Sequence, residues 1–418
     1  MNNYTMNSYE IKRDILNFSK KITKGLSKPE SKFIQDMLFG ISRSGSILIS
    51  EIARSLKEDI KLGYTIERLC DNLSNFDDTN IIMKNYYKEV NGNKSEEENI
   101  VLFDDGDITK IYGKKFEDID KLVDGSSPTK EVKPGYHICE ATMLTKNEKQ
   151  PVSIYSEIYS TKSKGFISTN KYTEESIDKA IEVVGKFTGV FDRGYDDNKI
   201  IIKMDNRGNY FVIRMKDRRN FLFKGKKKNC YEEALKRKGK VRMTLLFDDN
   251  CEYEVSVSHT RVTLPYNKKD YELVIVYGLS EERPLILLTN REIHSKEDLI
   301  KVVRLYFSRW RIEEYFRAKK QEYDLENIRV RSLKSINNLN KILTIFMGYI
   351  GMLSDKIDKK LLVIKIIERS KSLRNKIIVW LSQMARGIKE ILSYCHTGIK
   401  EWQEIEHLEK IKQLQLVL

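Results

Sequence analysis

The sequence predicts a mixed α/β protein with a helical N-terminal part, a mixed sheet, a β-rich insertion and a helical C-terminal tail. Three observations lead to this prediction. Apolar residues recur with helical spacing over about the first 90 residues, whereas short apolar runs typical of buried strands begin near residue 100. Helical spacing returns after residue 295 and continues to the end of the sequence.

Composition narrows the class of protein. The chain has 418 residues, 40% hydrophobic and 33% charged, so we expect a soluble globular protein of two or three domains. Its net charge of +14 favours a polyanionic partner. Five scattered cysteines without a CxxC pair predict free thiols in a cytoplasmic setting. The most apolar stretch, Ile342–Leu353, is too short to span a membrane and is expected to be a buried helix.

Residues 1–95 are predicted to form a helical domain. Four apolar faces, within residues 11–18, 33–38, 49–56 and 66–73, are separated by glycines and polar turns. Many lysines and arginines make this segment basic, which suits a DNA-binding module of helix-turn-helix type. A plain helical bundle fits the same pattern equally well, so both interpretations remain open.

Residues 96–215 are predicted to form the first part of a sheet domain. The expected elements are strands at 100–103, 136–144 and 151–159, a helix at 173–187 with Thr173 as N-cap, a strand at 188–191, a helix near 196–205 and a strand at 210–215. Three strands, helix, strand, helix, strand is the order of the ribonuclease-H-like fold. Asp105 and Asp192 each follow a short apolar strand.

Residues 216–294 are predicted to be a β-rich basic insertion, with strands at 241–247, 253–257, 273–277 and 285–288. The window 214–242 holds 13 Lys or Arg residues against three acids, so its positive charge is localised. Lys226, Lys227 and Lys228 form its densest run and are expected to contact DNA phosphates. A merely solubilising lysine run is the alternative.

Residues 295–353 are predicted to be helical and to complete the sheet domain, and residues 354–418 are the tail, which could bind DNA or a second subunit. Ser295 with Asp298 resembles a capping box at the start of the first helix. In the stretch 306–320, Tyr306, Arg309, Glu313 and Lys320 fall within an arc of roughly 60° on one helix face. Such a face suits phosphate and metal binding, although a solvated amphipathic helix would show the same spacing.

Three acids are candidate metal ligands: Asp105, Asp192 and Glu313. Residues at strand ends of an open α/β sheet can meet in one crevice, where three carboxylates would suit Mg²⁺ or Mn²⁺. Asp104 and Asp107 compete with Asp105 for the first position, and strand alternation would put Asp107 on the same face as Asp105. The five histidines show no zinc-ligand spacing.

The sequence blocks also carry a family resemblance. Tyr306-x2-Arg309-x3-Glu313-x6-Lys320 matches the Y-R-E-K signature of the insertion-sequence-four group of DDE transposases. FDDGD around Asp105 resembles the first-aspartate block of that group, and VFDRGY around Asp192 resembles the second. The resemblance covers roughly residues 95–350. Members of the group have a ribonuclease-H-like domain interrupted by a β insertion before the helix that bears the glutamate.

The resemblance implies an activity and residue roles. The activity is that of a transposase that cuts at transposon inverted-repeat ends and joins them to target DNA by two-metal phosphodiester transfer. Asp105, Asp192 and Glu313 would be the catalytic carboxylates and the ligands of Mg²⁺, for which Mn²⁺ can substitute. Tyr306, Arg309 and Lys320 would contact phosphates beside the scissile bond. Arg214 resembles a DNA-contacting arginine after the last sheet strand.

The partners implied are double-stranded DNA, as transposon ends and target, and a second copy of the chain in a synaptic homodimer, with no membrane. The location implied is cytoplasmic and nucleoid-associated. Two other functions stay open. One is a ribonuclease-H-like nuclease that does not join strands, and the other is a catalytically decayed transposase that still binds DNA.

Overall fold

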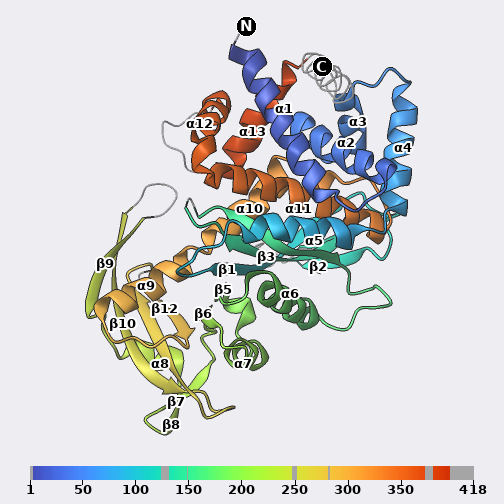
Figure 1. Ribbon diagram of the computed structural model, residues 1–418. Helices are drawn as coiled ribbons and strands as arrows, with labels where there is room; N and C mark the ends of the chain where they lie inside the picture. Colours follow the sequence, from blue (N-terminus) through green and yellow to red (C-terminus); the bar gives the residue numbers. More distant parts are fainter. Residues whose placement is uncertain are drawn as a thin grey trace.

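The computed structural model describes residues 3–123, 131–147, 149–246, 252–280, 283–371 and 380–395. Cys251 and the stretches 372–379 and 396–418 of the predicted tail therefore lie outside the described residues. Figure 1 shows a layer of helices on one side of a mixed sheet, two helices on the other side, and a strand-rich extension of the sheet. The mixed α/β class with helical N- and C-terminal parts is confirmed.

One twisted sheet organises the described residues. Its first part consists of β1 (Ile100–Thr109), β2 (Asp120–Val123), β3 (Val132–Leu144), β4 (Pro151–Tyr159), β5 (Thr188–Phe191) and β6 (Tyr210–Arg214). Strand β1 runs antiparallel to β3 and parallel to β5, and β5 runs parallel to β6. The central parallel strand β5 is short and buried along its whole length, as expected of a strand covered on both faces.

The insertion extends the same sheet. It contributes β7 (Asn220–Phe223), β8 (Lys226–Asn229), α8 (Cys230–Leu235), β9 (Val241–Leu246), β10 (Glu252–Thr263), β11 (Asp270–Tyr277) and β12 (Leu285–Thr289). Strand β12 pairs antiparallel with β6, and the order continues β11, β10, β7, β8. The four predicted insertion strands are present. The pair β7–β8 and helix α8 were not predicted, because their short polar segments lack a clear period.

Helices cover both faces of the first part of the sheet. Helix α6 (Thr169–Val184) contacts β3 and β4, and α7 (Asn198–Asn206) lies near it below the sheet in Figure 1. Helices α9 (Lys296–Phe307), α10 (Trp310–Gln321) and α11 (Leu333–Asp355) follow the insertion, and α10 and α11 lie on the opposite side of the sheet. Helix α11 contains the predicted apolar stretch and is buried over most of its length, as expected.

The helical layer is built from both ends of the chain. Helices α1 (Asn3–Ile22), α2 (Lys28–Ser44), α3 (Ile49–Leu56), α4 (Leu62–Asn75) and α5 (Thr79–Asn91) pack with α11, α12 (Lys360–Arg369) and α13 (Trp380–Ser393). Arg43 of α2 donates a hydrogen bond to the carbonyl of Cys395 at 2.6 Å. The described part of the predicted tail therefore packs against the N-terminal helices.

Three predicted boundaries were wrong. Helix α6 begins one turn early, because Ser168 caps it by accepting from the amide of Lys171, and Thr173 lies buried inside the helix. Strand β1 continues to Thr109, since pairing with β3 carries it through the aspartates. The stretch 306–320 forms two helices, because hydrogen bonds around Ser308 and Arg309 switch to the tighter i−3 pattern.

We expect Gly387→Ala to lower the free energy of unfolding by about 1–3 kcal/mol, because overpacking strains a close helix contact. A Cβ at this position would lie 1.9 Å from the carbonyl oxygen of Ile366 in α12. Urea unfolding followed by circular dichroism measures the change. The control is Gly63→Ala in α4, where a Cβ meets nothing within 4 Å and stability should be unchanged or slightly higher. Equal stability of the two variants would contradict this packing argument.

Candidate active site

Two aspartates lie side by side where the parallel pair β1–β5 ends. The last paired positions are Phe103 and Phe191, and the next residues along the two strands are Asp104 and Asp192. Strand β5 stops there, whereas β1 continues. Asp104 is therefore a residue inside a strand, and not, as predicted for this block, a residue beyond a strand end. Its side chain is 20% exposed.

Successive side chains of β1 point to opposite faces of the sheet. Position 106 faces α10, because a Cβ on Gly106 would contact the ring of Phe316. Asp104, two residues earlier on the same strand, therefore faces α10 as well. Asp105 and Asp107 belong to the other face, where Asp107 Oδ1 lies 3.0 Å from His137 Nδ1. Asp107 thus shares the face of Asp105, as strand alternation predicted.

Helices α9 and α10 bring the second group of residues to the sheet. The predicted capping box starts α9: Ser295 Oγ accepts from the amide of Asp298, whose carboxylate accepts from the amide of Ser295. The turn at Ser308 and Arg309 follows, held in part by the Ser308 hydroxyl donating to the carbonyl of Leu305 at 2.7 Å. Arg309 thereby lies at the junction of the two helices, and Glu313 one turn into α10.

Arg309 is the cation at the centre of the site. Its Nη1 lies 3.3 Å from Asp104 Oδ2, and its Nη2 donates to Glu313 Oε1. The side chain is 17% exposed, whereas that of Glu313 is 49% exposed. Burial lowers the pKa of Arg309, but Asp104 and Glu313 raise it more, so the pKa lies above its ordinary value. The guanidinium is therefore permanently charged and bridges Asp104 and Glu313.

Asp192 has its own partners. The Tyr306 hydroxyl donates to Asp192 Oδ1 at 3.5 Å, a long hydrogen bond, and Arg214 Nη1 lies 3.9 Å from the same oxygen. Burial, together with the nearby Asp192, raises the pKa of Tyr306, which stays protonated and able to donate. Arg214, at the end of β6, thus lies beside Asp192, and its predicted contact with DNA stays a prediction.

Burial, and to a smaller extent the neighbouring acids, shift the pKa of Asp104. Burial raises its pKa to about 7, and although Arg309 opposes the shift, Asp105, Asp192 and Glu313 add to it. A carboxyl group that is half protonated near neutral pH marks a place where negative charge is poorly compensated. A bound cation would relieve this excess.

The remaining predicted residues lie farther away. Lys320, two turns along α10 from Glu313, pairs with Glu326 at 3.2 Å. Lys226, Lys227 and Lys228 form β8 at the outer edge of the sheet, and strands β6, β12, β11, β10 and β7 lie between β8 and Asp192. Lys228 also pairs with Glu233 at 3.1 Å. The structure does not bring this lysine run to the acids.

A cleft of about 770 Å³ opens beside Glu313 and Arg309. Its walls include residues that the sequence prediction missed: Arg193, Tyr253, Arg283 and Trp310. Arg193 follows Asp192 and Trp310 follows Arg309 in the sequence, so both could have been predicted as site residues from their neighbours. Tyr253 and Arg283 come from the insertion, and no local pattern marks them. Arginines and aromatic rings together suit phosphates and bases of nucleic acid.

The acids fit a divalent metal by chemistry, because carboxylate oxygens are the ligands that Mg²⁺ and Mn²⁺ prefer. Their present arrangement is not a formed metal site. Among the described residues, no group of three or more His, Cys, Asp or Glu side chains is arranged to hold a metal ion. Arg309 pairs with Asp104 and Glu313, and Tyr306 and Arg214 contact Asp192.

Comparison with known families adds one finding. Residues 162–349 match the family model described as transposase DDE domain. The match includes Asp192, Arg309 and Glu313 and begins after β1, so Asp104 and Asp105 lie outside it. It suggests transposase activity, and this family generally uses divalent metal ions. No curated protein matches the sequence. Within the described residues, no helix is long and apolar enough to cross a membrane.

The raised pKa of Asp104 predicts a pH-dependent stability of the metal-free protein. Folding raises this pKa from 3.8 to about 7, so the folded protein binds the proton more tightly and loses stability as pH rises from about 4 to 7. Asp104→Asn removes this loss. Relative to the parent, the variant should gain on the order of 2–4 kcal/mol between pH 5 and pH 8.

Thermal unfolding in EDTA at both pH values measures this change. Asp59→Asn, at an exposed acid, is the control for a general charge effect. A stability difference between parent and Asp104→Asn that is the same at pH 5 and pH 8 would show that Asp104 titrates normally.

Proposed function

We propose that the protein is a DNA transposase of the insertion-sequence-four group, which cuts at transposon inverted-repeat ends and joins them to target DNA. One observation carries the proposal. Asp192 and Glu313, both inside the region matched to transposase DDE domains, lie with Asp104 around Arg309, beside a cleft lined by arginines and aromatic rings. Acids, phosphate-binding cations and stacking surfaces are the components that phosphodiester chemistry on DNA requires.

The strand order supports a ribonuclease-H-like catalytic domain. In space the strands follow the order β4, β3, β1, β5, β6, with the first pairs antiparallel and the last pairs parallel. Along the chain, α6 precedes β5 and α7 precedes β6. Apart from the short edge strand β2, this is the order of three strands, helix, strand, helix, strand expected of that fold.

Metal ions would be held by Asp192, Glu313 and one acid of β1. Two bound Mg²⁺ or Mn²⁺ ions would supply activation of the attacking oxygen and stabilisation of the leaving oxygen. Tyr306 orients the Asp192 carboxylate through its hydroxyl. The guanidinium groups of Arg309 and Arg214 would bind phosphate oxygens beside the cut, and Lys320 would contact the backbone farther along α10.

The family resemblance and the observed contacts favour different acids of β1 as the first metal ligand. The resemblance assigns Asp105, whereas Asp104 is the residue that faces α10 and contacts Arg309. Asp105 has Cys139 and His137 as neighbours on the other face. The contacts favour Asp104 as the first ligand, and single substitutions separate the two assignments.

We expect Asp192→Asn and Glu313→Gln each to lower metal-dependent cleavage by about 100-fold or more, since even residues that only support metal ligands cost 10- to 100-fold. Asp104→Asn should match them, and Asp105→Asn should retain more activity. The assay is cleavage, in Mg²⁺ and in Mn²⁺, of duplexes bearing inverted repeats identified beside the coding region. The reverse order of the two β1 variants would assign the ligand to Asp105.

The same reactions decide between the alternative functions. A target plasmid in the mixture reports joining, which a transposase performs and a simple nuclease does not. Cleavage that survives Glu313→Gln would contradict the assignment of Glu313 as a metal ligand. A parent protein that binds transposon ends without cutting them would be a decayed transposase. Crosslinking on paired ends tests the proposed homodimer.

The lysine run of β8 is proposed to contact DNA away from the acids. We expect replacement of Lys226, Lys227 and Lys228 by Gln to reduce the slope of log affinity against log salt by about 2–3, because each phosphate contact contributes about 0.9. Fluorescence anisotropy between low and moderate salt measures the slope. The matched triple Lys→Arg variant should keep it. An unchanged slope in the Gln variant would mean that the run is only a solvated edge.

A further inference from the structure

A buried ion pair joins the last turn of α10 to the sheet. Lys319 Nζ lies 2.7 Å from Glu140 Oε2 on β3, and both side chains are 0% exposed. The two residues are 179 positions apart in the sequence. Burial lowers the pKa of Lys319, and the Glu140 carboxylate opposes that shift. A fully buried ion pair is unusual and needs a reason.

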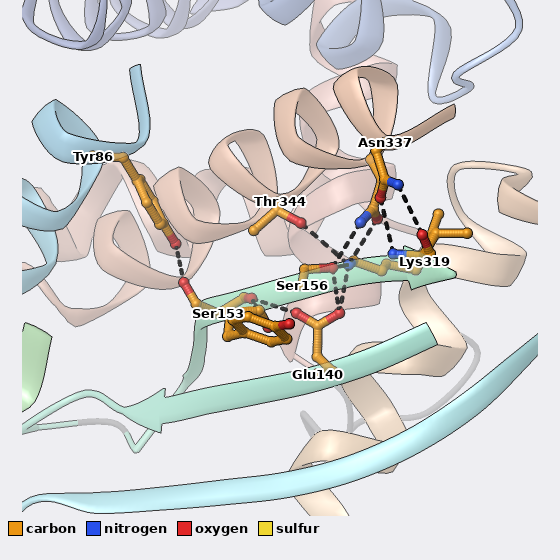
Figure 2. A network of polar contacts seen from close by, with 10 residues as sticks. Tyr86, Glu140, Ser153, Ser156, Lys319, Asn337 and Thr344 are labelled. Carbon is orange, nitrogen blue, oxygen red and sulfur yellow. Dashed lines mark hydrogen bonds and ion pairs between the residues drawn. The ribbon is translucent and has the colours of Figure 1, made fainter. Parts of the chain in front are cut away.

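The pair is satisfied by hydrogen bonds from two further elements, β4 and α11 (Figure 2). Lys319 Nζ also lies within 3.2 Å of Ser156 Oγ on β4 and of Asn340 Oδ1 and Thr344 Oγ1 on α11. Glu140 accepts from the hydroxyls of Ser153 and Ser156. No polar atom of Lys319 or Glu140 lacks a partner, so the network is complete within these described residues.

Stability alone does not account for this network. Removing two charges from water costs several kcal/mol per ion, and a pair of apolar side chains of similar volume is often as stable or more so. An apolar contact, however, tolerates rotation and sliding of a helix, whereas an ion pair with several fixed partners has one geometry. The network is suited to fixing a position.

The location of Glu140 shows that the network fixes α10 relative to strands β1 and β3. Glu140 is the direct cross-strand partner of Asp104, and both side chains face α10. Helix α10 supplies Lys319 to Glu140, and the junction at its start supplies Arg309 to Asp104. The next lysine, Lys320, pairs with Glu326. A rotation of α10 by one residue would break all three pairs.

We propose that Lys319 and Glu140 are positioning residues that fix the rotation and height of α10 over β1 and β3, and thereby hold Glu313 and Arg309 opposite Asp104. The effect on catalysis rests on the proposed function. The mechanical part, that the pair orders α10, does not depend on any reaction.

The test is the double variant Lys319→Met/Glu140→Leu. Methionine keeps the unbranched stem of lysine, and the serines keep partners, because Ser156 still accepts from Asn340 at 2.8 Å and Ser153 still reaches the Tyr155 carbonyl at 3.2 Å. Should this variant fail to fold, Glu140→Gln, which removes the charge but keeps the shape, takes its place. Folding is checked by circular dichroism and thermal unfolding.

The expected result is a folded protein, as stable as the parent, with a loosened α10. Hydrogen exchange of amides in 310–321 should rise by at least about tenfold, while exchange in 380–393 stays unchanged. Cleavage at saturating DNA and metal should fall about 10- to 100-fold, because small misplacements of catalytic groups have effects of this size. DNA affinity should stay within about twofold, since the cleft residues remain.

The matched control is Asn337→Leu. Asn337 lies on α11 in the same interface and bonds both backbone groups of Ile158, but it is not among the hydrogen-bond partners of Lys319, which are Glu140, Ser156, Asn340 and Thr344. This variant should unfold at lower temperature while exchange in 310–321 and the cleavage rate remain parental.

Parental exchange and cleavage in the double variant would overturn the proposal and leave the pair as a stabilising contact only. If the parent itself cuts no DNA, the proposed function fails, and exchange in 310–321 still decides whether the pair orders α10.

Discussion

Two acids directly opposite each other on neighbouring strands are the constraint on which this structure depends. Asp104 and Glu140 form a cross-strand pair, and like charges in that position repel. The segment 309–321 answers with one cation for each acid, Arg309 on the open side and Lys319 in the core. The junction before α10 places Arg309 beside Asp104, and α10 places Lys319 beside Glu140. The buried helix α11 adds hydrogen-bond partners for Lys319.

The two ion pairs differ in what they permit. Lys319 is enclosed on all sides, so its contacts can change only if helices separate. Arg309 borders a cleft and bonds an acid, Glu313, that is half exposed, so its contacts can be exchanged for those of a ligand. In the proposed reaction, the Lys319–Glu140 pair keeps α10 in place, while Arg309 and Glu313 exchange their contacts for contacts with DNA and metal. One short helix thereby combines rigidity with adaptability.

Sequence reasoning succeeded where structure is set locally. The capping box at Ser295, the apolar strands and the buried helix α11 follow from nearest-neighbour patterns, and so do the positions of Arg309 and Glu313 one turn apart. Sequence reasoning failed where the structure depends on contacts between residues that are far apart in the sequence. Strand β1 passes through its aspartates because β3 pairs with them, which decides the face of Asp104. The Lys319–Glu140 pair gave no signal, since a lysine beside Lys320 looks like another surface charge.

The helical layer has a consequence for how the chain is made. The carbonyl that receives the hydrogen bond of Arg43 belongs to a residue 352 positions later. At roughly 5–20 residues per second, the ribosome needs on the order of 20–70 s to supply it. The N-terminal helices therefore emerge with faces that only late-synthesised helices can cover. Nascent chains should meet chaperones during this interval, and residues 1–95 expressed alone would expose the apolar surface that α13 covers.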